Sequence, residues 1–233
     1  MIEHIEQGIL PRGKKAVIAL TSWKKRINTV GLTIYNLFTM CGPEFHIVLT
    51  LAEEEFPRKE QELPRDLVLM NRAGVFEILW VKKNYKAFKK WLFCSKRFPS
   101  VPIISADDDC IYICNYANEL YNAWTHNKTA RIGMSHSARF NLLLLGGCST
   151  INPPHCFSRF ELSELCKLTN VCEDDMFYSL LAKKYHIPCM TLNHTPAEYV
   201  LFCNDNDALS AHREYGDKSD YYKFIELFKT LNL

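Results

Sequence analysis

The sequence predicts a single α/β domain, residues 1–233, built on a mostly parallel sheet that is flanked by helices. Short apolar runs alternate along the chain with segments in which apolar residues recur at helical spacing. Hydrophobic residues make up 48% of the 233 residues, which is enough for one substantial core. Such strand–helix alternation is typical of parallel sheets that are covered on both faces.

The expected strands are the short apolar runs at residues 15–20, 46–51, 76–81, 102–106, 131–135 and 187–192. Helices are expected at residues 27–38, ended by Gly42-Pro43, and at 86–98, 116–124, 173–185 and 219–228. The polar segment 53–65 contains two prolines and indicates a loop or a short helix, and the pattern loosens after residue 135. A buried helix segment is the alternative for each strand, because periodicity does not separate the two at this length.

Charge and composition exclude several classes of protein. Charged residues make up 23% and the net charge is +2, so there is no general attraction to nucleic acid or anionic lipid. A run of about 20 apolar residues is absent from the sequence, and the acid-containing start is not a secretory signal, so we expect a cytoplasmic protein. Ten cysteines without a CxxC pair give little support for structural zinc and are expected to be mostly buried thiols.

Three adjacent aspartates, Asp107, Asp108 and Asp109, follow the expected strand at 102–106. Their carboxylates repel one another, and no basic residue beside them in the sequence relieves this, so a divalent cation would supply the missing charge. Mg²⁺ and Mn²⁺ prefer oxygen ligands and commonly bind one or two carboxylates together with substrate phosphates. An exposed acidic turn that caps a helix is the alternative. We favour the metal site, since ligands bind at the carboxyl ends of parallel strands.

A second acidic cluster, Glu173-Asp174-Asp175, opens an expected helix. Each acid at a helix N-terminus is favourable by about 0.3–1 kcal/mol through the macrodipole, which explains one acid better than three. The functional interpretation is a general base, or an orienting carboxylate, that faces an acceptor hydroxyl. Asp174 and Asp175 are therefore candidate catalytic residues, and the choice between them is left open.

Basic residues gather in two segments. Seven lie between Lys82 and Arg97, and three more, ending at Arg26, follow Thr21-Ser22. A diphosphate needs positive charge beyond one metal ion, and lysine or arginine supplies it. A solvated helix face is the alternative for most of these residues, so we expect only one or two to reach the site.

Together these motifs resemble a group of bacterial glycosyltransferases similar to family 2, found in capsule and lipopolysaccharide gene clusters. The resemblance covers most of the chain and is carried in order by LTSWKKRI (20–27), VLTLAEEEFP (48–57), LP (63–64), EILWVKKNYKAFKKW (77–91), IISADDDCIY (103–112), GGCSTINPP (146–154) and EDDMFYSLLAKKYHI (173–187). It implies a GT-A fold, with a nucleotide-sugar-binding half at about 1–112 and an acceptor-binding half at about 113–233.

The resemblance also implies a role for each site residue. Asp107 and Asp109 would bind Mn²⁺ or Mg²⁺ as a DxD-type motif, with His212 as a further ligand, although the tail around His212 is only loosely similar to the family. Asp174 or Asp175 would be the base in an inverting enzyme. The residues implied at the nucleotide are Thr21, Ser22, Arg26, Glu54, Lys89, Lys90, Asp107 and Asp108. The chain departs from the family at residues 53–55, three glutamates where an aspartate pair is common, which puts the uracil contact in doubt.

The predicted function is metal-dependent transfer of a sugar from a nucleotide sugar, UDP-linked by preference, to a cell-surface glycan or lipid-linked acceptor. The metal and the basic residues would stabilise the charge that develops on the leaving diphosphate. The enzyme would be cytoplasmic, either free in the cytoplasm or peripherally bound to the cytoplasmic face of the inner membrane. Two alternatives are a two-metal nuclease or phosphotransferase, for which a more basic surface is expected, and a non-catalytic nucleotide-sugar-binding module.

Overall fold

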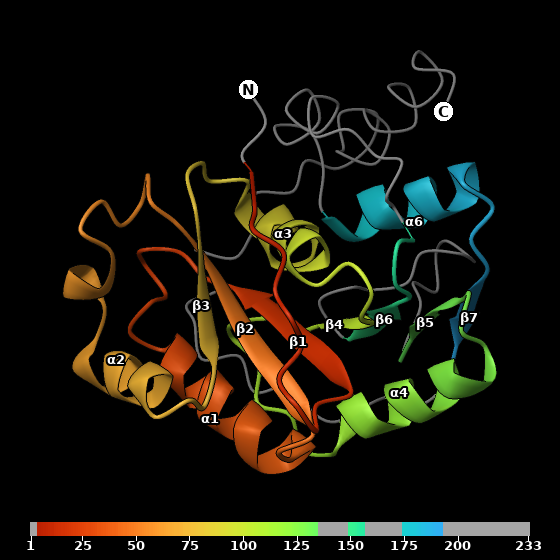
Figure 1. Ribbon diagram of the computed structural model, residues 1–233, viewed down its shortest axis with the longest axis horizontal. Helices are drawn as coiled ribbons and strands as arrows, with labels where there is room; N and C mark the ends of the chain where they lie inside the picture. Colours follow the sequence, from red (N-terminus) through yellow and green to blue (C-terminus); the bar gives the residue numbers. More distant parts are fainter. Residues whose placement is uncertain (1–3, 135–148, 157–173, 193–233) are drawn as a thin grey trace, which may run out of the picture.

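The computed structural model describes residues 4–134, 149–156 and 174–192, in which seven strands form one sheet in the order β3-β2-β1-β4-β6-β5-β7 (Figure 1). The strands are β1 (Ala16–Thr21), β2 (Phe45–Ala52), β3 (Glu77–Val81), β4 (Ile103–Ser105), β5 (Arg131–Gly133), β6 (Thr150–Asn152) and β7 (Cys189–Thr191). The α-helices are α1 (Val30–Cys41), α2 (Arg65–Arg72), α3 (Lys89–Arg97), α4 (Tyr116–His126) and α6 (Asp174–Lys184), and the 3-10 helices are η1 (Lys59–Glu62) and η2 (Lys86–Phe88). Within the described residues, no helix is both long and apolar enough to cross a membrane.

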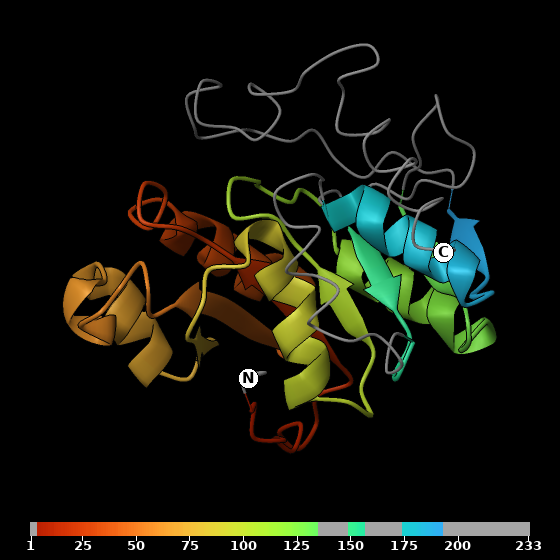
Figure 2. The ribbon, with the colours of Figure 1, turned by 90° about the horizontal axis from the view of Figure 1, so that it is seen from above.

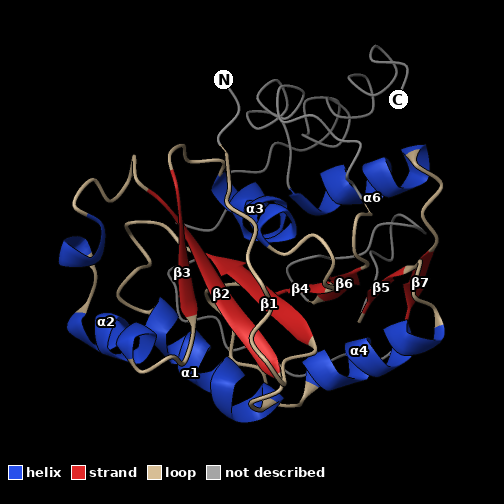
Figure 3. Cartoon of the chain, viewed as in Figure 1, coloured by secondary structure: helices blue, strands red, loops and turns tan. Residues whose placement is uncertain are grey.

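Helices cover both faces of the sheet. α1, α2 and α4 lie on one face, and α3 and α6 lie next to each other on the opposite face (Figures 2 and 3). The side chains of β1 alternate between the two layers: Ile18 and Leu20 pack in the core formed with α1 and α4, and Val17 and Ala19 pack in the core formed with α3 and α6. Burial on both faces explains why β1 is a continuous apolar run instead of an alternating one.

The mostly parallel sheet expected from the sequence is confirmed. β1 pairs in parallel with β2 and with β4, β2 with β3, and β5 with β7, whereas β6 runs antiparallel to both β4 and β5. The carboxyl ends of β1, β2, β3 and β4 therefore meet at one edge. The chain segments that follow these four strands carry most of the candidate site residues, and Asp174 and Asp175 lie in α6.

Several expected elements begin or end elsewhere in the structure. The predicted end of the first helix is confirmed, since α1 stops at Cys41 and Gly42 follows with a φ of 83°, a conformation that glycine adopts without steric cost. Residues 86–88 form η2, so α3 starts at Lys89 and not at residue 86. Residues 53–65 were predicted to form a loop or a short helix, and they contain the short helix η1. The helix α2, which begins directly after Pro64, was not predicted. The helix expected at 219–228 lies outside the described residues.

β6 is the other element that the sequence did not reveal. It has three residues, Thr150–Asn152, and Ile151 is the one apolar side chain among them. A strand of this length between a Gly-Gly and a Pro-Pro pair has too few positions to show an apolar period. Its antiparallel pairing with β4 nevertheless places it directly beside the strand that leads into the aspartates.

Candidate metal and nucleotide site

The loop that follows β4 carries the three adjacent aspartates and is fixed by two buried side chains. The Thr33 hydroxyl of α1 donates to the carbonyl oxygens of Asp108 at 3.1 Å and Cys110 at 3.0 Å. The backbone N–H of Asp107 donates to the Tyr112 hydroxyl at 3.0 Å. Thr33 and Tyr112 are almost fully buried, so the aspartates are held on a rigid support and not on an exposed turn.

The three aspartates differ in their surroundings. Asp108 is 7% exposed, and its carboxylate accepts hydrogen bonds from Ser22 Oγ at 2.6 Å and from Arg26 Nη1 at 2.9 Å. The same Arg26 nitrogen lies 2.8 Å from Asp109 Oδ2. The side chain of Asp107 is 34% exposed. Asp108 thus connects the loop to the end of β1, and the flanking carboxylates are the ones placed to bind a ligand.

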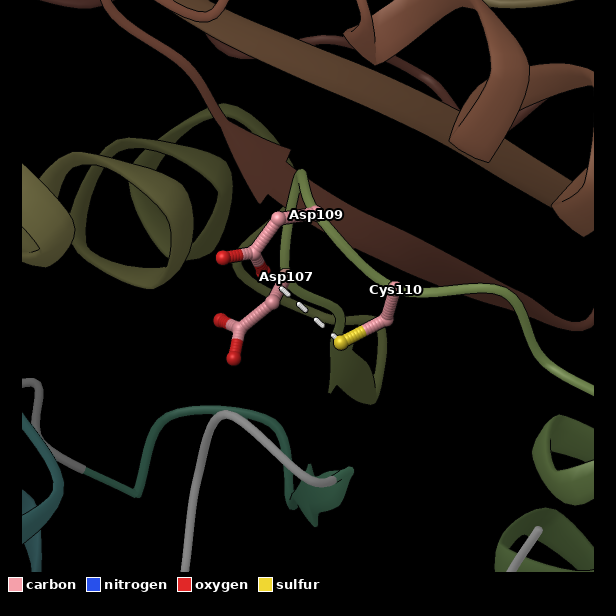
Figure 4. A group of neighbouring side chains, drawn as sticks. All are labelled: Asp107, Asp109 and Cys110. Atoms are coloured by element: carbon pink, nitrogen blue, oxygen red, sulfur yellow. Dashed lines mark hydrogen bonds between the residues drawn. The ribbon is translucent and has the colours of Figure 1, made fainter. Parts of the chain in front are cut away.

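Asp107, Asp109 and Cys110 form a group that could hold a metal ion. One ligand atom from each lies within 4.8 Å of the others, and Figure 4 shows both carboxylates on the same side of the loop. The Cys110 thiol donates to Asp109 Oδ1 at 3.7 Å. Two carboxylates with open positions beside them suit Mg²⁺ or Mn²⁺, which also take substrate phosphate oxygens as ligands.

Lys90 connects this group with the second acidic cluster. Its side chain comes from α3, the residue is 4% exposed, and its ammonium lies 2.9 Å from Asp107 Oδ1 and 3.1 Å from Asp174 Oδ2. Asp174 is the first residue of α6 and is buried, and Asp175 beside it is partly exposed. The structure therefore brings together two acidic clusters that are far apart in the sequence.

Burial and mutual repulsion shape the charges of the site. Burial raises the pKa of Asp108, and burial together with the negative charge of Asp107 raises the pKa of Asp109. Burial alone would lower the pKa of Lys90, but the surrounding carboxylates, Asp107 and Asp174 first among them, outweigh it and raise that pKa well above the ordinary value. Arg26 pairs with Asp108 and Asp109, and Lys90 pairs with Asp107 and Asp174, so each of these cations faces two carboxylates. This excess of carboxylates favours binding of a cation.

A second polar network, centred on the buried Lys89, lies at the ends of β2 and β3. Lys89, 1% exposed, places its ammonium 3.1 Å from Glu55 Oε2 and 2.6 Å from Asn84 Oδ1. The backbone N–H of Asn84 donates to Glu54 Oε2 at 2.8 Å. Burial lowers the pKa of Lys89. The adjacent lysines of α3 thus reach different parts of the edge, Lys89 toward the glutamates and Lys90 toward the aspartates.

The structure brings most of the predicted site residues to this edge, with partners that the sequence did not show. Ser22 and Arg26, expected at the nucleotide, bond to the aspartate loop. The Thr21 hydroxyl donates to the Thr50 carbonyl at 2.6 Å, within the sheet. His212 lies outside the described residues.

Four residues with a part in the site were missed. Thr33 and Tyr112 support the loop, Cys110 joins the candidate metal group, and Asn84 connects two of the predicted residues. Asn84 and Cys110 had a usable signal, since each stands shortly after an apolar strand at the carboxyl edge of the sheet. Thr33 acts through long-range hydrogen bonds to backbone, and Tyr112 through a hydrogen bond to the backbone five residues before it, and neither bond leaves a pattern in the sequence.

Comparison with protein-family models gives no match, and comparison with curated sequences gives none either. Solved structures are similar in fold. A mannosyltransferase from Pyrobaculum calidifontis, in complex with GDP-Man and Mn²⁺, matches 81% of this chain with a TM-score of 0.50 and 10% identity, and the match spans 58% of its own length. A Bacillus anthracis protein described as a glucose-1-phosphate thymidylyltransferase, in complex with sucrose, matches 88% of this chain and 98% of its own, with a TM-score of 0.54 and 10% identity.

These likenesses concern the fold. A mixed, mostly parallel sheet with helices on both faces, shared with a glycosyltransferase and a nucleotidylyltransferase, is the GT-A-like fold of nucleotide-sugar transferases. They do not single out the bacterial family 2 enzymes that the sequence motifs resemble. Fold likeness alone does not determine a reaction, so the activity has to be argued from the site.

Proposed function

We propose that this protein is a metal-dependent glycosyltransferase that uses a nucleotide-sugar donor. The observation that carries the proposal is the pair of carboxylates, Asp107 and Asp109, beside one another on a rigid loop at the carboxyl edge of the sheet, in a site with unbalanced negative charge. A diphosphate is itself anionic and would be repelled by this edge without a cation between them. The Mn²⁺ in the mannosyltransferase with the same fold supports this interpretation.

In this mechanism Asp107 and Asp109 hold Mn²⁺ or Mg²⁺, which when bound neutralises negative charge on the diphosphate leaving group. Asp174 or Asp175 orients the acceptor hydroxyl, and one of them takes its proton. The acceptor oxygen forms a bond to the anomeric carbon, and the bond from that carbon to the diphosphate oxygen breaks, with its electron pair going to the nucleotide diphosphate.

The second polar network is our candidate for recognition of the nucleoside. Lys89 and Glu54 lie there with Asn84, near the ends of β2, which pairs with β1, and of β3, which pairs with β2. We keep UDP as the expected nucleotide and test GDP beside it, because the mannosyltransferase is bound to GDP-Man. The acceptor we propose is a cell-surface glycan or lipid-linked sugar, used at the cytoplasmic face of the membrane.

Calorimetric titration of UDP and of GDP, each with Mn²⁺ and with EDTA, tests the proposal. We expect one of the nucleotides to bind at least about tenfold more tightly with the metal, because a cation held by Asp107 and Asp109 would offset the repulsion between the carboxylates and the diphosphate. Release of the same nucleotide from its sugar conjugates, measured with water as acceptor, then tests turnover. Equal affinity with Mn²⁺ and with EDTA would contradict the metal bridge, and binding without turnover would favour the non-catalytic module.

Nucleotidyl transfer is the second candidate, since the fold matches nearly the whole length of the thymidylyltransferase. That reaction requires a site for a nucleoside triphosphate, and phosphate-binding loops are commonly rich in glycine so that backbone N–H groups can approach the phosphates. Residues 21–29, the segment after β1, contain no glycine. Pyrophosphate release from a nucleoside triphosphate and a sugar 1-phosphate would favour this alternative over glycosyl transfer.

A further inference from the structure

Lys90 bonds to both acidic clusters. Its ammonium lies 2.9 Å from Asp107 on the metal side and 3.1 Å from Asp174 on the acceptor side. An ammonium buried to this degree is costly unless carboxylates compensate its charge, and here two carboxylates do so. The Lys90 ammonium and Asp174 therefore belong to the interior of the protein, whereas the Asp107 carboxylate is partly exposed.

The core between α3 and α6 fixes this arrangement. The rings of Trp91 and Tyr178 lie 4.8 Å apart between centroids, and those of Phe88 and Phe177 lie 5.2 Å apart. All four residues are buried. Because Lys90 is next to Trp91 and Asp174 begins the helix that carries Phe177, packing of the aromatic rings determines where the ammonium and the carboxylate meet.

The direction of the Lys90 side chain has a consequence for metal binding. An ammonium bonded to Asp107 repels a divalent cation that uses the same carboxylate. A lysine that served mainly to bind the diphosphate would have the opposite effect, since its loss would weaken nucleotide binding. The two roles therefore differ in the sign of an experimental result.

We propose that Lys90 is a positioning residue that ties the metal-side carboxylate Asp107 to the acceptor-side carboxylate Asp174, and that it does not bind the donor diphosphate. The catalytic effect of this role rests on the proposed function. Lys90 holds Asp174 in the orientation needed beside the acceptor hydroxyl, and it does so at the expense of metal affinity at Asp107.

Lys90→Met tests this, with Lys89→Met as the matched control. Both lysines are on α3 and both are buried, but Lys89 bonds to Glu55 and Asn84 and not to the aspartates. In Lys90→Met we expect Mn²⁺ alone to bind about tenfold more tightly, because a repelling charge is removed. We also expect kcat for hydrolysis of the nucleotide sugar to fall about 100-fold while the donor KM does not rise. In Lys89→Met the loss should appear in nucleotide affinity, without tighter Mn²⁺ binding.

Weaker binding of Mn²⁺ or of the nucleotide in Lys90→Met would overturn the proposal in favour of a diphosphate ligand. An unchanged Mn²⁺ affinity and kcat would leave Lys90 with a packing role only and would equally overturn it. If Lys90→Met does not fold, Asp174→Asn gives an independent result: the ammonium then interacts with Asp107 alone, so Mn²⁺ affinity should fall, and no change would refute the bridge. Wild-type protein that binds Mn²⁺ but shows no metal-dependent nucleotide binding or turnover would instead refute the proposed function.

Discussion

Substitution of two adjacent aspartates in the loop after β4 by asparagine should affect different properties. Asp108→Asn should lower the stability of the fold, and Asp107→Asn should lower Mn²⁺-dependent nucleotide binding. Asp108→Asn removes a buried carboxylate that accepts from Ser22 and Arg26, and hydrogen bonds to charged groups are worth about 1.5–3 kcal/mol. Arg26 keeps its contact with Asp109 at 2.8 Å, so the loss is below the roughly 3–5 kcal/mol of a fully orphaned buried charge. We expect a loss of about 2 kcal/mol, or about 4–8 °C in melting temperature for a chain of this length.

Asp107→Asn is the matched comparison. Its side chain is 34% exposed, and Lys90 retains Asp174 at 3.1 Å, so we expect a loss of about 1 kcal/mol or less. Its effect should fall on function, with loss of Mn²⁺-dependent nucleotide binding. Thermal denaturation without ligand and calorimetry with Mn²⁺ and nucleotide measure the two effects separately. Equal melting temperatures for the two variants, or Asp107→Asn with normal Mn²⁺-dependent binding, would refute the division between a supporting aspartate and a ligating one.

Two further perturbations have defined outcomes. Because the pKa of Asp109 is raised above its ordinary value, the folded protein binds this proton more tightly than the unfolded chain. The contribution of Asp109 to stability therefore increases as pH falls from neutral through the raised pKa and levels off near the ordinary value, while Mn²⁺ affinity decreases over the same range. Melting curves at several pH values with and without Mn²⁺ measure both effects, and Mn²⁺ affinity independent of pH there would contradict the assignment of Asp109. Tyr112→Phe removes the acceptor for the backbone N–H of Asp107. This should lower the free energy of unfolding by about 1–3 kcal/mol and weaken Mn²⁺ binding. A melting temperature equal to that of the wild type would show that the hydroxyl does not support the loop.

The parallel part of the fold was predictable because its strands are buried on both faces. β1 and β2 are continuous apolar runs, and their predicted bounds differ from the observed ones by a residue at each end. α2 was missed because Leu67 is its one buried residue and half of its eight residues are polar or charged. β6 was missed because three residues cannot display a period. Both elements take their place through tertiary packing, which a local pattern does not contain.

The candidate site was predictable in its residue types and not in which cation pairs with which carboxylate. Asp107, Asp108 and Asp109 stand out because they follow an apolar strand, and no basic residue lies beside them in the sequence. One or two residues of the two basic segments were expected near the site, but the sequence did not show which carboxylates they meet. Arg26 reaches Asp108 and Asp109 because β1 and β4 are adjacent in the sheet, and Lys90 reaches Asp107 from the helix that covers both strands. Which cation meets which carboxylate depends on strand order, and strand order is not a local property of the chain.

The pairing of β1 with β4 also affects how the chain acquires its site during folding. β1 ends at Thr21 and β4 begins at Ile103. The chain between these two strands, which bring Arg26 to the aspartates, contains three α-helices, two 3-10 helices and two other strands. Parallel contacts of such sequence separation form late and slowly, because the entropy of closing the loop is lost before the contacts stabilise it. A partly folded chain then has the aspartates without the geometry that selects a metal ion. Acquisition of high-affinity Mn²⁺ binding in a refolding experiment would therefore report the completion of the sheet, and metal added early would not accelerate its assembly.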